Sequence, residues 1–166
     1  MTCIGCGATK KLQNCEYCAR PVCKNCSEFL SDDDFSFYPK APKTIKLGAV
    51  CDECFITHVE PEKVIYDELM AKASEVYFLT KNYRGNVRIS AKHTKRVSVA
   101  SCLDRRETIM RLAFFAAQLG FNAILEGELV DKKIRVDGYQ STRWSGSAMP
   151  ATIDGEHLER ASLRGF

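Results

Sequence analysis

The chain has 166 residues, of which 45% are hydrophobic and 27% charged, and 24 Lys and Arg against 21 Asp and Glu give a formal net charge of +3. This length suits one ordinary domain or a small module beside a compact one, and the small charge surplus argues against a dedicated nucleic-acid-binding protein. No apolar run approaches the roughly 18 residues of a membrane span, and nine Phe, six Tyr and one Trp are too much apolar surface for a disordered chain.

The cysteines are distributed unevenly, because eight of the nine lie between positions 3 and 54 and only Cys102 lies beyond. Residues 1–6 have neither the basic lead nor the apolar core of a secretory signal peptide. We therefore expect a cytoplasmic location, where disulfide-rich scaffolds are rare. The distribution divides the chain into a cysteine-rich segment, residues 1–58, and a cysteine-poor remainder.

The eight clustered cysteines form four pairs with one shared Cys-x2-Cys spacing: Cys3 with Cys6, Cys15 with Cys18, Cys23 with Cys26, and Cys51 with Cys54. Each pair can place two thiolates on one tetrahedral zinc ion, so two pairs complete a four-cysteine site. Because such a site has no open position for water, the spacing predicts two structural Zn²⁺ ions rather than catalytic ones. Four pairs in series also argue against a single redox motif, and two separate tetrahedral centres suit the spacing better than an iron–sulfur cluster.

The spacing alone leaves open which pairs share an ion. Only four residues separate Cys18 from Cys23, so these neighbouring pairs compete for one small volume. An interleaved arrangement relieves the crowding by using alternate pairs, with Cys3, Cys6, Cys23 and Cys26 on the first ion and Cys15, Cys18, Cys51 and Cys54 on the second. Each ion would contribute on the order of 10 kcal/mol to a segment too small to fold alone.

Two cysteine-bearing segments resemble the FYVE-type zinc fingers. Residues 14–27 (NCEYCARPVCKNCS) are similar to the central segment of that family, and residues 49–55 (AVCDECF) are similar to its closing segment. The resemblance spans residues 1–58 and includes all eight clustered cysteines. It implies the interleaved, cross-braced pair of zinc sites and a helix after Cys54.

The resemblance does not extend to the phosphoinositide headgroup pocket of that family. The family uses an early tryptophan–aspartate motif, a basic His-His-Cys-Arg segment and a final Arg-Val-Cys segment. This chain has no early Trp, and it carries Gln13 and Asn14 in place of the two histidines, and Glu16 and Ala49 in place of the two arginines. Because the charge-assisted bonds to phosphate are lost with these cations, we expect a finger that binds a protein partner rather than a phosphoinositide.

A linking helix is predicted over residues 59–75. Pro61 suits its first turn, and the acidic Glu60 and Glu62 suit the positive end of the helix dipole. An apolar stripe at helical spacing follows, formed by Val64, Ile65, Leu69 and Ala73.

Residues 76–154 predict an α+β domain, and residues 155–166 a polar tail. The expected strands are residues 76–80, 87–89, 97–99, 121–125, 134–140 and 142–148. A helix is predicted from Asp104, which can cap its start, to Leu119, with Gly120 as the residue that ends it. The resulting order, β-β-β-α-β-β-β, predicts one helix laid across a mostly antiparallel sheet.

Within residues 76–153, the segments 104–124 and 139–148 resemble the YbjQ-type small α+β family. That family has a long helix ending in a Gly-Ala-Asn-Ala-like turn and a closing Gly-Thr-Ala-like strand, which residues 120–123 and 146–148 approximate. The resemblance implies a ring-forming, homo-oligomeric domain. The metal-binding label of that family has no evident cysteine or histidine ligands here.

A basic stretch between Lys81 and Arg111 holds nine cations against two carboxylates. Its candidate contacts with nucleic acid or another anion are Lys81, Arg84, Arg88, Lys92, Lys95 and Arg96. The competing interpretation is a solvated outer face of the sheet, where lysines deter pairing with other chains.

We therefore expect a non-catalytic, zinc-binding adaptor or scaffold that acts through protein–protein interaction. The alternatives are nucleic-acid binding through residues 81–111 and phosphoinositide or membrane-surface binding by the finger. Cys102 precedes the predicted helix and has no partner histidine in its sequence context, so it is interpreted as a small buried residue rather than a nucleophile.

Overall fold

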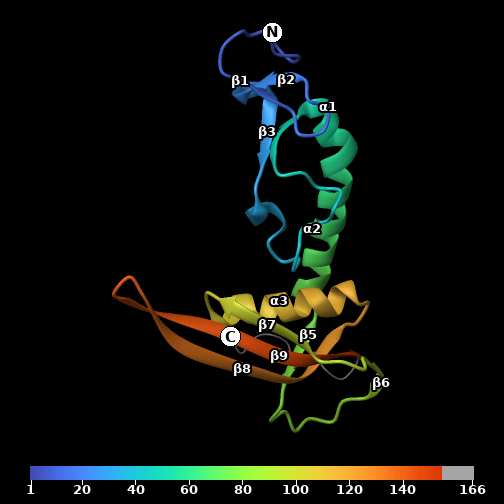
Figure 1. Ribbon diagram of the computed structural model, residues 1–166. Helices are drawn as coiled ribbons and strands as arrows, with labels where there is room; N and C mark the ends of the chain where they lie inside the picture. The colour runs from blue at the N-terminus through green and yellow to red at the C-terminus, as the bar shows by residue number, and fades with distance from the viewer. Residues whose placement is uncertain (155–166) are drawn as a thin grey trace. The chain divides into compact units, whose positions relative to one another are not determined.

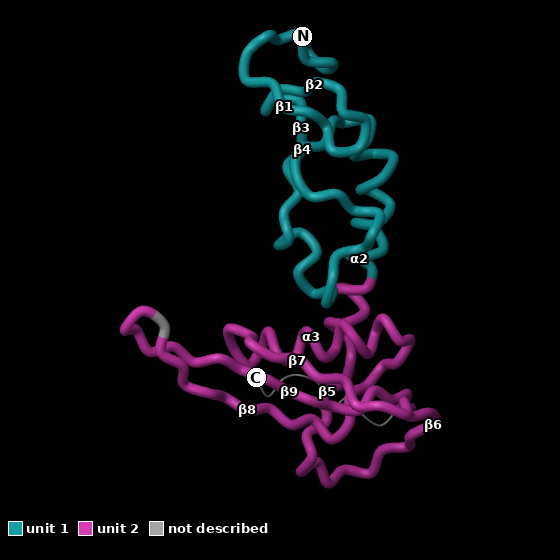
Figure 2. Tube along the Cα trace, in the orientation of Figure 1, with its two compact units in different colours: residues 1–68 teal, residues 69–166 magenta. Residues whose placement is uncertain are grey.

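The structure is a computed structural model that describes residues 1–154. It divides into two compact units, unit 1 formed by Met1–Glu68 and unit 2 beginning at Leu69 (Figure 2). The polar tail predicted at residues 155–166 lies outside the described residues. Within residues 1–154, no helix is both long enough and apolar enough to cross a membrane.

Unit 1 contains two small antiparallel sheets, in which β1 pairs with β2 and β3 pairs with β4 (Figure 1). Its strands and 3-10 turns are, in chain order, β1 (Leu12–Asn14), β2 (Pro21–Cys23), η1 (Lys24–Cys26), β3 (Ser27–Leu30), η2 (Asp32–Phe35) and β4 (Gly48–Cys51). The fully buried apolar side chains are few and small, chiefly Val22, Val50 and Val59. Such an interior is too small to stabilise the unit unaided.

The helix that follows β4 begins earlier than predicted. Its parts are α1 (Asp52–Cys54), a π-helical turn η3 (Phe55–Val59) and α2 (Glu60–Ser74), and they succeed one another without a break. The predicted start at Glu60 is therefore wrong, and Pro61 lies inside the helix. In the π turn, the Glu60 N–H donates to the Phe55 carbonyl. This wider turn accommodates a proline, which has no N–H to donate and whose ring crowds the preceding turn.

The predicted apolar stripe of α2 is wrong for two of its four residues. Val64 and Ile65 are 52% and 50% exposed, whereas Tyr66 and Ala73 are buried. Tyr66 packs edge-to-face against Phe35, with ring centroids 5.4 Å apart. An aromatic ring buries more area than either aliphatic neighbour, so the helix turns Tyr66 inward and leaves Val64 and Ile65 outside.

Unit 2 is one helix packed on a curled five-stranded sheet, which confirms the predicted α+β class (Figure 1). Its elements are β5 (Tyr77–Thr80), β6 (Ile89–Lys92), β7 (Val97–Cys102), α3 (Arg105–Gln118), β8 (Ala123–Val136) and β9 (Tyr139–Ile153). The strand order is β5-β8-β9-β6, and β7 also pairs with β9. Only β5 and β8 run parallel, and the other pairs are antiparallel.

The predicted strand over residues 134–140 is wrong, because it crosses a hairpin turn. Asp137 and Gly138 have φ angles of 51° and 84°, as a type I′ turn requires, and Asp-Gly is a strong sequence signal for that turn. β8 and β9 therefore form one long hairpin, in which residues predicted as three separate short strands belong to two. The strand predicted at residues 87–89 begins only at Ile89.

Helix α3 has the predicted ends. The Asp104 carboxylate accepts the Glu107 N–H at 2.7 Å, and the Glu107 carboxylate accepts the Leu103 N–H at 2.6 Å. At the other end Gly120 takes a φ of 81°, where a side chain would be strained. The buried face of α3 includes Leu112 and Phe114, both without exposed surface.

Asn122 joins the start of β8 to the end of β9. Its side-chain amide donates to the Ile153 carbonyl at 3.0 Å, and its Oδ1 accepts the Ile153 N–H at 2.9 Å. We expect Asn122→Ala to lower the free energy of unfolding of unit 2 by about 1–3 kcal/mol, because it leaves buried backbone groups unpaired. Urea denaturation followed by the fluorescence of Trp144, the single tryptophan, measures this change. Asn86→Ala, at an exposed loop position, is the control, and equal midpoints for the two variants would contradict the assignment.

Candidate metal centres

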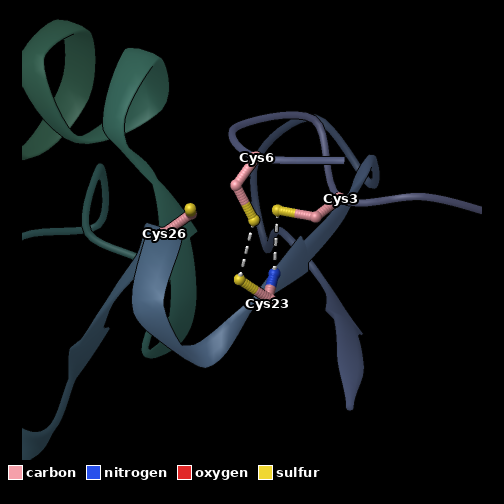
Figure 3. Close-up of side chains that lie close together, drawn as sticks. All are labelled: Cys3, Cys6, Cys23 and Cys26. Atoms are coloured by element: carbon pink, nitrogen blue, oxygen red, sulfur yellow. Dashed lines mark hydrogen bonds between the residues drawn. The ribbon is translucent and has the colours of Figure 1, made fainter. Parts of the chain in front are cut away.

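The structure gathers the eight clustered cysteines into two groups, each with four sulfurs within 4.8 Å of one another. Site 1 is Cys3, Cys6, Cys23 and Cys26 (Figure 3), and site 2 is Cys15, Cys18, Cys51 and Cys54. The grouping is the interleaved one that relieves the crowding between neighbouring pairs. None of these cysteines is in a disulfide.

The spacing of the sulfurs fits a tetrahedral metal ion. With metal–sulfur bonds of about 2.3 Å, the edge of a tetrahedron of sulfurs is about 3.8 Å. The Sγ atoms of Cys6 and Cys23 lie 3.6 Å apart in site 1, and those of Cys18 and Cys51 lie 3.8 Å apart in site 2. Each group could therefore hold one metal ion with little movement.

The first cysteine pair of each site lies in the same kind of turn. In both turns the N–H of the first cysteine donates to the carbonyl five residues on, at 2.8 Å for Cys3 and 3.0 Å for Cys15. The N–H of the residue after the second cysteine returns to the carbonyl of the first, at 2.9 Å from Gly7 and 2.8 Å from Ala19. Those two residues have φ angles of 72° and 58°. Glycine adopts this conformation without strain and alanine does not.

The second pair of each site starts a helical turn. Cys23 precedes η1 and Cys51 precedes α1. Each also donates its N–H to the first sulfur of its own site, Cys23 to Cys3 at 3.3 Å and Cys51 to Cys15 at 3.5 Å. The two sites thus share the same turn at the first cysteine pair and the same helical start at the second. The sequence analysis missed this structural repeat, because only the cysteine spacing is repeated in the sequence.

Protonation within each site is uneven. The Cys23 N–H, donated to the thiolate, lowers the pKa of Cys3 to about 6, and the Arg20 guanidinium lowers the pKa of Cys18 to about 6. The neighbouring Cys6 sulfur raises the pKa of Cys26 to about 12, and burial raises the pKa of Cys54 to about 12. Four thiolates so close repel one another, so a cation among them is what allows all four to deprotonate.

Two side chains support the sites from outside. The Arg20 Nε donates to Cys18 Sγ at 3.3 Å. The same guanidinium pairs with Glu53, which lies between Cys51 and Cys54 in the sequence. In site 2, Tyr17 stacks on His58 with ring centroids 4.7 Å apart. The sequence analysis assigned neither Arg20 nor Tyr17 a role. The contacts of Arg20 with Glu53 and of Tyr17 with His58 join residues more than thirty positions apart, and the local contact of Arg20 with Cys18 has no sequence signature.

The four positions at which the sequence departs from the FYVE-type pattern, Gln13, Asn14, Glu16 and Ala49, carry no cation. Glu16 donates its N–H to the Ala49 carbonyl at 2.9 Å, so these two positions are neighbours. Their side chains are a carboxylate and a buried methyl group, while the Gln13 amide is bonded to Ser27 at 3.1 Å. These side chains themselves offer a phosphate no charge-assisted bond, and the nearby Lys46 ammonium donates to the Glu16 carbonyl at 3.0 Å.

The predicted basic contacts are divided between paired and exposed side chains. Lys92 and Arg96 both bind Glu126, at 2.9 and 3.1 Å, and Lys81 binds Glu128 at 2.8 Å. Hydrogen bonds from Lys92 and Lys81 lower the pKa values of the Glu126 and Glu128 carboxyls, respectively. Three cations are thus partly neutralised. The other three are exposed, and the structure gives them no ion pair within residues 1–154: Arg84, Arg88 and Lys95.

Cys102 is buried at the end of β7, where its Sγ lies 3.8 Å from the Ala100 carbonyl. Its burial agrees with the interpretation as a small packing residue. It lies in neither cysteine group.

Comparison with protein-family models, with curated proteins and with solved structures finds no match. The FYVE-type and YbjQ-type resemblances, and the ring formation that the second implies, therefore stay predictions. The class that the fold and the cysteine geometry define is a chain with a small finger-like unit, able to bind two metal ions, and an α+β unit.

If each site holds one metal ion, a single substitution of a cysteine ligand should lower the number of bound ions per chain by one. We expect two metal ions per wild-type chain and one per chain for Cys51→Ser, because three thiolates hold an ion far more weakly than four. Cys102→Ser is the matched control and should keep both ions. Elemental analysis against protein concentration measures the ratio, and a Cys51→Ser protein that retains two ions would contradict the assignment.

Gly5 lies between the cysteines of the first pair and faces the Cys26 side chain. A Cβ at this position would lie 2.9 Å from Cys26 Cβ and 3.0 Å from its Sγ. We expect Gly5→Ala to displace Cys26 and to weaken site 1 alone, so that a chelator removes one ion at a concentration that leaves the other bound. If Gly5→Ala releases its two ions over the same range of chelator concentration as the wild type, the contact between Gly5 and Cys26 has no effect on site 1.

Proposed function

We propose that unit 1 is a zinc finger with two structural Zn²⁺ ions and that the protein is a non-catalytic adaptor or scaffold that binds a protein partner. Tetrahedral sites made of four thiolates favour zinc among the common cellular metals, with iron as the main competitor. Metal analysis distinguishes the two. Thiolate ligands also need a reducing compartment, which supports a cytoplasmic location.

The closed coordination of both sites supports a structural role. Catalytic zinc keeps one position for water or substrate, and a site with four protein thiolates has none. The ions instead join segments that are far apart in the sequence, because site 1 connects Cys3 to Cys26 and site 2 connects Cys15 to Cys54. Cross-links of this kind stabilise a unit whose buried apolar side chains are few.

The observation that best supports protein binding is the open edge of β3. Among residues 1–154, β3 pairs only with β4, and Figure 1 shows it on the side of unit 1 away from the helix. Phe29, in the middle of β3, is 70% exposed. An unpaired strand edge with an exposed aromatic side chain is a template for an added strand from another chain.

The charge along this edge indicates the kind of partner. Glu28, Asp32 and Asp33 are exposed along β3 and the turn that follows it. Asp34 is engaged locally, since its carboxylate accepts the Ser31 N–H at 2.7 Å. We infer that the occupant is an extended segment of a partner protein, rich in Lys and Arg, that adds to β3 with an apolar side chain on Phe29.

A selection from displayed twelve-residue peptides, followed by NMR titration of the full chain, tests this function. Selected peptides should be basic, should shift the amide signals of Ser27–Leu30, and should bind Phe29→Glu at least tenfold more weakly. Ile56→Glu is the matched control, because Ile56 is likewise an exposed apolar residue of unit 1, at 62%. Failure to select any peptide, or selected peptides that bind Phe29→Glu and wild type equally, would contradict the proposal.

A further inference from the structure

The distal part of the β8–β9 hairpin is a two-stranded arm. β7 pairs with β9 as far as Trp144 and no further towards the turn. Beyond it, β8 and β9 have only each other as partners within residues 1–154, from the pair Lys132–Arg143 to the pair Val136–Tyr139. At about 3.3 Å per residue these five pairs extend about 17 Å, and Figure 1 shows the ribbon running past α3. We name residues 132–143 the arm.

The arm is strongly basic and its cations have no carboxylate partners. It holds four cations against one carboxylate, that of Asp137 in the turn. Within residues 1–154 the structure gives none of these cations an ion pair: Lys132, Lys133, Arg135 and Arg143. This distinguishes the arm from the predicted basic stretch, where Glu126 and Glu128 neutralise three of the six candidate side chains.

The register of the arm places like charges together. Lys132 and Arg143 are directly opposite in the pairing of β8 with β9, so both side chains lie on one face. Like charges in this position destabilise a hairpin, and a two-stranded hairpin is already marginal in water. A polyanion bound between the two cations would turn this repulsion into attraction.

The shape and tip of the arm match one polyanion in particular. A two-stranded β-ribbon fits the major groove of B-form DNA, which is about 12 Å wide, whereas the major groove of an RNA duplex is too narrow for side chains to enter. Strand alternation puts Lys133 and Arg135 on the face opposite Lys132, so cations flank both sides of the ribbon. Tyr139, directly after the tight turn at Asp137–Gly138, is 81% exposed at the tip.

We propose that the arm is a binding site for duplex DNA. The arm enters the major groove, and its cations contact the phosphates of both DNA strands. The site lies in unit 2 and is independent of the function proposed for unit 1. Lys132 and Arg143 make phosphate contacts, and Tyr139 contacts the groove at the tip.

Fluorescence anisotropy of the full-length, metal-loaded protein with a labelled 20-base-pair DNA duplex tests the proposal at several salt concentrations. Wild type should bind at 50 mM salt, with an affinity that falls steeply as salt rises. The double variant K132Q/R143Q should bind more weakly, and the slope of log affinity against log salt should fall by about 2. Circular dichroism of each variant establishes that the fold is retained.

The matched control is K63Q/K72Q, which removes two exposed cations of α2 outside the arm and should leave the slope unchanged. An equal fall in slope for both double variants would overturn the proposal, because the effect would then be general charge. No binding of the DNA duplex by wild type at 50 mM salt would also overturn it. So would tighter binding to an RNA duplex of the same sequence, or to phosphatidylserine vesicles, than to the DNA.

Discussion

Four cysteine sulfurs held within 4.8 Å of one another, twice in one small unit, are the constraint on which unit 1 depends. Backbone N–H groups and the Arg20 guanidinium lower the pKa values of Cys3 and Cys18, whereas the neighbouring Cys6 sulfur raises the pKa of Cys26 and burial raises the pKa of Cys54. Only a cation at the centre of each group makes four thiolates compatible. Bonds to such ions would join Cys3 to Cys26 in site 1 and Cys15 to Cys54 in site 2, so we propose that metal binding and folding of unit 1 are one process.

The two units therefore depend on different sources of stability. Unit 2 has a sheet of five strands and a helix whose buried face includes Leu112 and Phe114, so burial of apolar surface stabilises it. Unit 1 offers mainly small residues such as Val22 and Val50 to its interior. This contrast explains why eight of the nine cysteines are concentrated in one third of the chain. Phe29 in strand β3 is exposed, and this is the strand to which we propose that a partner segment adds.

The four Cys-x2-Cys pairs and the ends of α3 could be predicted from local spacing, with Asp104 three residues before Glu107. Which pairs share an ion could not be read from the spacing alone, and the prediction depended on the crowding between Cys18 and Cys23 and on the FYVE-type resemblance. Residue pattern alone misplaced the start of the long helix, since Pro61 is a good first-turn residue and nothing in its neighbourhood shows that a π turn allows it inside the helix. The FYVE-type resemblance, in contrast, implied a helix after Cys54, and residues Phe55–Val59 are helical. Tyr66 was missed for a different reason. Its burial depends on Phe35, thirty-one positions away. The Asp137–Gly138 turn could have been predicted from the sequence alone. It was missed because the alternating pattern of the flanking residues indicated one continuous strand over residues 134–140.

The ion pairs of Glu126 and Glu128 show why a basic stretch in a sequence is a weak guide to a basic surface. Both acids lie on β8, some thirty to fifty residues from Lys81, Lys92 and Arg96, and only the pairing of strands brings them together. The arm is the opposite case, since its cations are neighbours in the hairpin and have no ion pair among residues 1–154.

The central claim is that each site is closed around one zinc ion by four sulfurs, and X-ray absorption at the zinc edge of the purified protein tests it most directly. The account predicts a single shell of four sulfur neighbours at about 2.3 Å for both ions. A shell containing nitrogen or oxygen neighbours, with correspondingly fewer sulfurs, would show an open or differently built site and would contradict the structural role on which the account of unit 1 depends.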